Sequence, residues 1–152
     1  MTSLMNKNCG RAVLTLIVIA GILACLDGPA GAQGKAEKTF SATVTDTQGL
    51  NTEVKNIIFY WEEKISETAF VPHELKQIPV KRGTATINVK FDTIKFIDIN
   101  PGPDKALPML NITLANGKTG EFALAIDGKF KGESDFGEVE LPASGLRKVV
   151  FK

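Results

Sequence analysis

Acid–base and nucleophilic chemistry in proteins depends most often on histidine, and this chain of 152 residues holds one, His73. A Ser-His-Asp site needs the imidazole within hydrogen-bond reach of a nucleophile, and no serine of the chain lies in a nucleophile-elbow context. A zinc site needs three or four nitrogen, sulfur or oxygen ligands, so a lone histidine does not indicate one. We therefore expect no catalytic residue, no metal and no other cofactor, and keep His73 as a candidate binding residue.

Acidic residues near the end of the chain offer the only other pattern with catalytic meaning. Glu133, Asp135, Glu138 and Glu140 form pairs, and two carboxyl groups about 5 to 9 Å apart across a cleft can hydrolyse a glycosidic bond. Glu138 and Glu140 stand two positions apart, hence on one face of a strand. A solvated outer face explains them without catalysis, so a small carboxylate-dependent hydrolase is the alternative function and not the first.

Tyr60 and Trp61 carry the binding hypothesis. They are the only tyrosine and the only tryptophan of the chain, and they are adjacent. In a regular strand they point to opposite faces, so one of them is expected to face outward. An exposed aromatic ring can stack on a sugar or anchor a protein partner. Packing of both rings in the core is the alternative.

The first 32 residues predict a cleaved signal peptide. Lys7 and Arg11 form a positive region, and residues 12–26 are an uncharged, mostly apolar run of 15 residues. A helix needs about 20 residues to span the hydrocarbon core, so this run is short for a membrane anchor. Residues 30–32, Ala-Gly-Ala, supply the small-residue pattern that precedes cleavage. We expect a periplasmic or secreted protein, with an uncleaved anchor or a lipid on Cys25 as alternatives.

Removal of the signal peptide changes both the cysteine count and the charge. Both cysteines lie in it, so the mature domain is expected to fold without disulfides or metal thiolates. The remaining chain has 16 basic and 16 acidic residues, interleaved rather than in blocks. Binding to nucleic acid through charge requires a basic surplus. We therefore expect no nucleic-acid partner, and no integral membrane span after cleavage.

Alternation of apolar and polar residues predicts half-buried strands through the mature chain. The pattern is clear at 40–45 and 84–91, and Asn116-Gly117 between two alternating runs is a strong hairpin signal. Proline residues make 65–81 an expected irregular insertion, with a short strand at its end. The expected organisation is a flexible leader at 33–39, a first β unit at 40–99 with an insertion at 65–81, a linker at 100–108 and a second β unit at 109–152.

An internal repeat relates the two β units. Residues 94–99 align with 146–151 at an offset of 52, and residues 42–46 align with 112–116 at an offset of 70. The difference of 18 residues is about the length of the insertion, which indicates two copies of one unit. Chance likeness between two all-β segments is the alternative. A unit of about 50 residues is marginal alone, so the two are expected to pack together.

The Asn-Gly hairpin within residues 110–118, with the Glu-Val-Glu-Leu-Pro and Val-Val-Phe strands within 136–151, resembles small five-stranded SH3-like and Sm-like barrels. The resemblance implies an all-β fold of two similar barrels packed together, or one β-sandwich, and it implies no activity. The residues that read RNA bases in Sm-like proteins have no match here. The chain is also similar to small exported bacterial proteins of unknown function.

The expected function is therefore an exported, non-enzymatic β module that binds or scaffolds in the cell envelope or outside the cell. Its expected partner is an envelope or extracellular protein or a glycan. Tyr60, Trp61 and His73 are the candidate contact residues. A lipid-anchored subunit of an envelope complex is a further alternative, beside the hydrolase.

Overall fold

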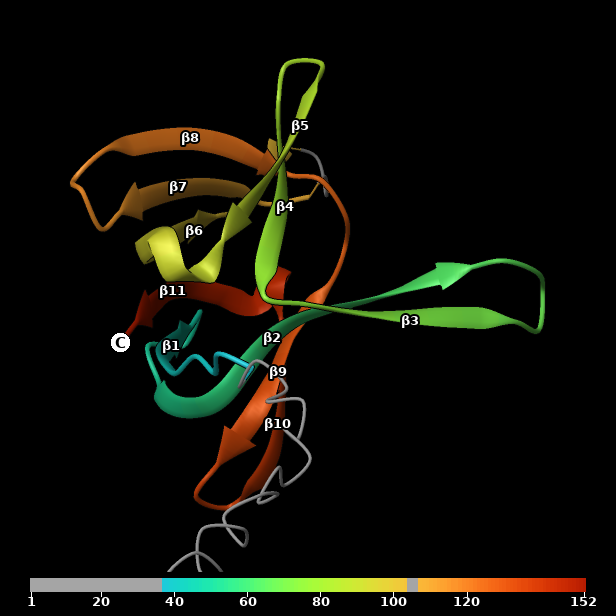
Figure 1. Ribbon diagram of the computed structural model, residues 1–152, viewed down its shortest axis with the longest axis horizontal. Coiled ribbons are helices and arrows are strands. Elements are labelled where there is room, and N and C mark those ends of the chain that lie inside the picture. The colour runs from blue at the N-terminus through green and yellow to red at the C-terminus, as the bar shows by residue number, and fades with distance from the viewer. Residues whose placement is uncertain (1–36, 104–106) are drawn as a thin grey trace, which may run out of the picture. The chain divides into compact units, whose positions relative to one another are not determined.

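The computed structural model describes residues 37–103 and 107–152, and residues 38–152 form one compact unit. The described chain is all-β and antiparallel, with eleven strands and two short 3-10 helices (Figure 1). These are β1 (Ala42–Asp46), β2 (Asn51–Lys64), β3 (Phe70–Leu75), β4 (Gln77–Arg82), β5 (Ala85–Lys90), η1 (Phe91–Thr93), β6 (Ile94–Asn100), β7 (Met109–Leu114), β8 (Thr119–Leu124), β9 (Lys129–Ser134), β10 (Gly137–Pro142), η3 (Ala143–Gly145) and β11 (Leu146–Phe151). Within these residues no helix has the length and apolar character needed to cross a membrane.

The all-β prediction is confirmed, but the expected architecture is wrong. The strands form one sheet in the order β10-β9-β2-β1-β11-β6-β7-β8-β4-β5, with β3 paired to β2. This sheet is not closed into a barrel, so neither two separate barrels nor a sandwich of two sheets describes it. The reason is that strands of the two sequence halves pair with each other: β1 with β11, and β2 with β9.

The strand order nevertheless obeys the internal repeat. Strands β4, β5 and β6 begin 52 residues before β9, β10 and β11 respectively, and the 3-10 helix η1 begins 52 residues before η3. The front of the repeat has an offset of 68 rather than the expected 70, because the positive-φ turn glycines Gly49 and Gly117 correspond. If each strand is replaced by its equivalent in the repeat, the ten-strand order reads the same from the opposite end. Ile97 pairs with its own equivalent, Val149, at the centre of this symmetry.

The symmetry defines two five-stranded modules, and each module contains strands from both halves of the sequence. Module I contains β1 and β2 with β9, β10 and β11, and module II contains β7 and β8 with β4, β5 and β6. The β1–β11 and β6–β7 pairings match in register and both contain a bulge at the same place. Each module therefore takes two strands from one half of the chain and three from the other, and the β6–β11 pairing joins them.

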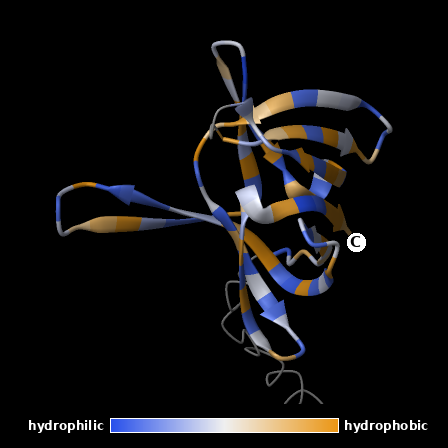
Figure 2. Cartoon of the chain, turned by 180° about the vertical axis from the view of Figure 1, so that it is seen from behind, coloured by the Kyte–Doolittle hydropathy of each residue, from blue (hydrophilic) through white to orange (hydrophobic). Residues whose placement is uncertain are grey.

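Packing of side chains holds this sheet together, since the described residues include no cysteine. Hydrophobic and hydrophilic positions alternate along the strands (Figure 2), and most of the strands bury one face. Phe59, Phe91 and Phe130 are the largest fully buried side chains, and the Phe59 and Phe130 rings meet edge to face at 5.5 Å. A fully buried phenylalanine contributes about 1.5 to 3 kcal/mol relative to an exposed one, so these rings anchor the core.

A bulge bends β2 as it passes from β1 to β9. The register between β2 and β9 shifts between Lys55 and Ile58, and Asn56 in the bulge has a φ of 53°. Asparagine tolerates this left-handed conformation better than most residues. Gly132 of β9 lies against the bulge so closely that an added Cβ would stand 2.6 Å from the backbone oxygen of Lys55. The bend therefore requires glycine at this position.

The end of β2 and β3 form a two-stranded arm, residues 61–75, which runs away from the other strands (Figure 1). The sequence pattern predicted an irregular segment from residue 65 on, but β3 is regular and contains Pro72. Proline is tolerated there because β3 pairs with β2 alone, and an edge strand can lack an N–H donor. Ile65, Phe70 and Val71 at the end of the arm are exposed.

Candidate functional site

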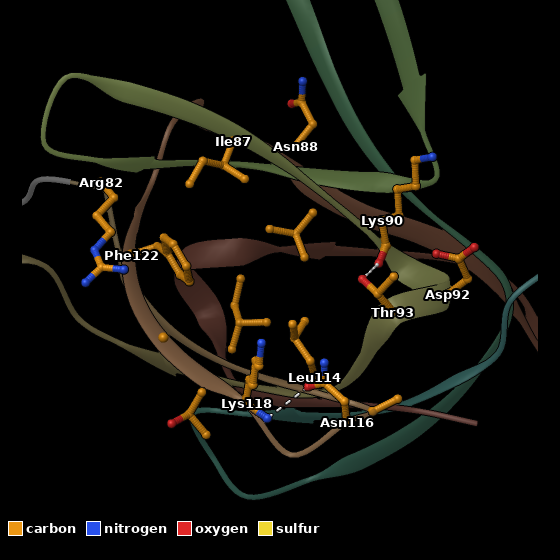
Figure 3. A pocket seen from close by; sticks show the side chains of 15 residues that line it. Arg82, Ile87, Asn88, Lys90, Asp92, Thr93, Leu114, Asn116, Lys118 and Phe122 are labelled. Carbon is orange, nitrogen blue, oxygen red and sulfur yellow. Dashed lines mark hydrogen bonds between the residues drawn. The ribbon is translucent and has the colours of Figure 1, made fainter.

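A pocket of about 710 Å³ lies in module II, between β5, η1 and the β7–β8 hairpin (Figure 3). Its volume is within the range of about 300 to 1,000 Å³ that is typical of small-molecule sites. Strands β5 and β7 belong to different halves of the chain, and the pocket exists because module II combines them. We call it the module II pocket.

The floor of the module II pocket is apolar. Ile87 and Val89 come from β5, and Ile112, Leu114 and Phe122 come from β7 and β8. Residues two apart in a strand share a face, which places Ile87 with Val89 and Ile112 with Leu114. Ile87 is 39% exposed, whereas its neighbour across the β4–β5 ladder, Val80, is fully buried. The pocket therefore leaves apolar surface open to solvent inside the fold.

Gly120 shapes one wall of the pocket. The ring of Phe122 leans back over it, so that a Cβ at position 120 would stand 2.7 Å from the ring. A larger residue would push the ring away, because the space over β8 is already filled. Glycine thus lets the aromatic ring lie along the wall and widen the apolar floor.

Cations surround this floor. Arg82, Lys90 and Lys118 line the pocket together with one acid, Asp92. Figure 3 shows Arg82 beside Phe122, whereas Lys90 and Asp92 lie at the opposite end. Among the described residues, none of the three cations forms an ion pair. The rim thus carries an excess of two positive charges.

Hydrogen bonds to the backbone fix the ends of the pocket. The Thr93 hydroxyl donates to the Lys90 carbonyl oxygen at 2.8 Å, and the Lys118 N–H donates to Asn116 Oδ1 at 3.0 Å (Figure 3). The second bond closes the Asn-Gly turn between β7 and β8. The Ala115 N–H donates to the Thr93 carbonyl oxygen at 2.9 Å and ties the turn to η1. The two sides of the pocket are therefore held at a set spacing.

The three residues singled out in the sequence lie elsewhere, where the arm leaves the sheet. Trp61 and His73 are cross-strand partners whose rings stack at 4.2 Å and 10°, and His73 Nε2 lies 3.1 Å from Glu63 Oε2. The Trp61 indole N–H is buried without a hydrogen-bond partner. One face of the Trp61 ring is thus covered by His73 and is closed to a sugar.

Tyr60 points to the other face of the arm and is 9% exposed. Its hydroxyl donates to Glu62 Oε1 at 2.6 Å, and this bond raises the pKa of Tyr60. Lys131 lies 3.6 Å from the centre of its ring. Tyr60 and Trp61 do border a shallow groove of about 340 Å³ with Gly128, but no residue lining it comes from β3.

Ion pairs occupy two of the four carboxylates that are candidates for hydrolysis, Asp135 and Glu140. Glu140 accepts hydrogen bonds from Lys129 at 2.7 Å and lies 2.8 Å from Lys131 Nζ, and these contacts lower its pKa to about 2. Lys55, at 2.9 Å, also lowers the pKa of Asp135. A general acid needs a pKa near the working pH, so neither group is suited to deliver a proton. The described residues hold no group of three or more potential metal ligands.

Sequence reasoning missed the module II pocket. Residues 84–91 were expected as a strand, and the alternation of Ile87 and Val89 was visible in it. The strands that face it depend on how the two halves of the sequence pair, which no local pattern reveals.

A search of protein-family models, of curated proteins and of solved structures finds no match for this chain.

Proposed function

We propose that this protein is an exported, non-enzymatic binding module whose ligand is an elongated apolar molecule held in the module II pocket. The observation that carries the proposal is the open apolar floor within a cavity of about 710 Å³. Small-molecule sites are typically concave and mostly apolar, with a few polar groups that orient the ligand. Arg82, Lys90 and Lys118 are the polar groups that suit this role.

The exposure of Ile87 supports the proposal. An isoleucine at 39% exposure in the middle of a strand loses part of the free energy that burial would give. A ligand lying on Ile87, Val89 and Leu114 restores that burial. The apolar floor also favours an apolar ligand over a glycan, which needs hydrogen-bonding groups and an open aromatic face.

The place of action remains a proposal from the sequence alone. The signal peptide expected at 1–32 and the lipid site at Cys25 lie outside the described residues. We propose export to the periplasm or to the outside of the cell, where a carrier of apolar molecules keeps them in solution. A glycan or a protein docked on the arm is the other binding mode that the sequence raises.

A fluorescent apolar probe tests the pocket directly. N-phenyl-1-naphthylamine, which is uncharged, is expected to bind the wild-type protein with a rise in its emission. Ile87→Glu is expected to abolish the rise, because it places a charge on the floor. Ile65→Glu is the matched control, since Ile65 is an exposed isoleucine of the arm. No emission rise with the wild type, or equal loss in both variants, would overturn the proposal.

A further inference from the structure

We propose that the ligand of the module II pocket is an amphiphile with one carboxylate head and an unbranched apolar chain, as in a free fatty acid. This inference rests on the proposed function and adds the charge of the ligand to it. The chain would lie on the floor formed by Ile87, Val89 and Leu114. The carboxylate would meet the cations of the rim, with Arg82 as its main partner.

Comparison of the two modules shows that the fold does not need these cations. By the offsets of 52 and 68, Arg82 corresponds to Ser134, Lys90 to Pro142 and Lys118 to Leu50. None of the three module I residues is charged. The two modules share their strand order and the register of the β1–β11 and β6–β7 pairings, bulge included, so a cation required for this shared framework would be expected in both. The positive rim is therefore a property of module II alone.

The apolar floor of the pocket is also better developed in module II than at the equivalent positions of module I. Phe122 corresponds to Val54 and Leu114 to Asp46, so the module I position has less apolar surface and an acid where module II has a leucine. Asp46 also accepts hydrogen bonds from the backbone of its own turn, at 2.8 and 2.9 Å. Only module II thus combines a wide apolar floor with positive charge.

Arg82 is the best-placed cation for a carboxylate. It lies at the Phe122 end of the pocket, whereas the charge of Lys90 stands near Asp92 at the other end (Figure 3). A guanidinium can bind a carboxylate through two parallel hydrogen bonds. Because no described residue pairs with Arg82, a ligand would displace only water from it.

Three ligands of equal chain length separate charge from apolar contact. Decanoate, decanol and decyltrimethylammonium would each be used to displace N-phenyl-1-naphthylamine, below their aggregation concentrations. Decanoate is expected to bind about fivefold more tightly than decanol, and decyltrimethylammonium more weakly than both. The preference for decanoate is expected to shrink as salt is raised, because ions screen exposed charges.

Two substitutions introduce the equivalent module I residue at a position of the module II rim. Arg82→Ser and Lys118→Leu are each expected to weaken decanoate binding about two- to fivefold, the effect of an exposed ion pair. Decanol offers no charge to either cation, so its binding should change far less than that of decanoate, and circular dichroism verifies that each variant is folded. Lys95→Ser is the control, since Lys95 is an exposed cation of β6 that does not line the pocket.

The outcomes distinguish this inference from the proposed function. If decanol displaces the probe as well as decanoate does, the ligand is not selected by charge, and only the apolar pocket stands. If the probe binds but neither decanoate nor decanol displaces it, the proposal that the ligand has an unbranched apolar chain is wrong. If the probe does not bind, both proposals fail. Equal loss of decanoate binding in Lys95→Ser and Arg82→Ser would show a general charge effect and overturn the role of the rim.

Discussion

Gly132 provides the sharpest test of how the sheet is built. It lies in β9 against the bulge of β2, where an added Cβ would stand 2.3 Å from Val54 Cγ1 and 2.6 Å from the Lys55 carbonyl oxygen. The side chain of Val54 is fully buried, and the Lys55 oxygen belongs to the backbone. Neither atom can move without displacing β2, so Gly132→Ala must shift a strand rather than a flexible side chain.

The expected cost follows from this geometry. Inserting one methyl group into a packed core costs about 1 to 3 kcal/mol, and a clash with backbone belongs at the upper end. A loss of about 3 kcal/mol is a large share of the about 5 to 15 kcal/mol that stabilise a domain. For a unit of this size we expect the melting temperature to fall by about 10 °C.

Urea unfolding followed by the fluorescence of Trp61, the only tryptophan, measures the effect. Gly145→Ala is the matched control, because a Cβ at Gly145 meets nothing within 4 Å. This control is expected to change stability by less than about 0.5 kcal/mol. Equal midpoints for Gly132→Ala and Gly145→Ala would refute the close approach of β2 and β9.

Three further predictions concern charge and processing. The pKa of Glu140 is lowered to about 2 by its lysine partners, so these contacts stabilise the fold above a pH of about 4.5 and lose their effect as the pH falls toward 2. Glu140→Gln should therefore lower the urea midpoint at pH 7 and not at pH 2. Glu62→Gln should lower the pKa of Tyr60, measured by the absorbance of this single tyrosine, because Glu62 raises it in the wild type. Mass spectrometry of the exported protein should find Gln33 at the N-terminus, whereas a lipid on Cys25 would contradict cleavage after residue 32.

Local patterns in the sequence predicted much of the secondary structure. The alternation at 40–45 and 84–91 corresponds to β1 and β5, and Asn116-Gly117 forms the turn between β7 and β8. These features depend on neighbours in the chain, which a short window contains. The pairing of β1 with β11 depends on residues about 100 positions apart, and no window contains both.

The arm shows where local reasoning misleads. Residues 62–64 are all charged, yet β2 continues through them to Lys64. Charge ends a strand only where a face must be buried, and this part of the arm is exposed to solvent. Pro72 likewise predicts an irregular segment, but it lies in an edge strand, where its missing N–H interrupts no pairing.

The candidate site was the part least accessible from sequence. Tyr60, Trp61 and His73 attract notice because they are rare in this chain, and two of them form a stacked pair that supports the arm. The pocket instead uses common residues such as Ile87 and Lys118, whose meaning comes from their place. The repeat could have indicated the pocket from the sequence, because at the correct offsets three cations of one copy have uncharged equivalents in the other.

Module I combines strands from the two ends of the chain, which affects how the chain reaches its native state. Val44 of β1 pairs with Val149, 105 positions later, as well as with the nearby β2, so the first strand lacks one of its two partners until nearly the whole chain is present. A large sequence separation between contacting residues slows folding, because the entropy of closing the loop is lost before the contacts stabilise the chain. Module I cannot be complete before β11 is made, whereas module II is one contiguous stretch, residues 77–124. With these pairings, module II is expected to form first and module I to be completed in a late step, when β9, β10 and β11 join β1 and β2.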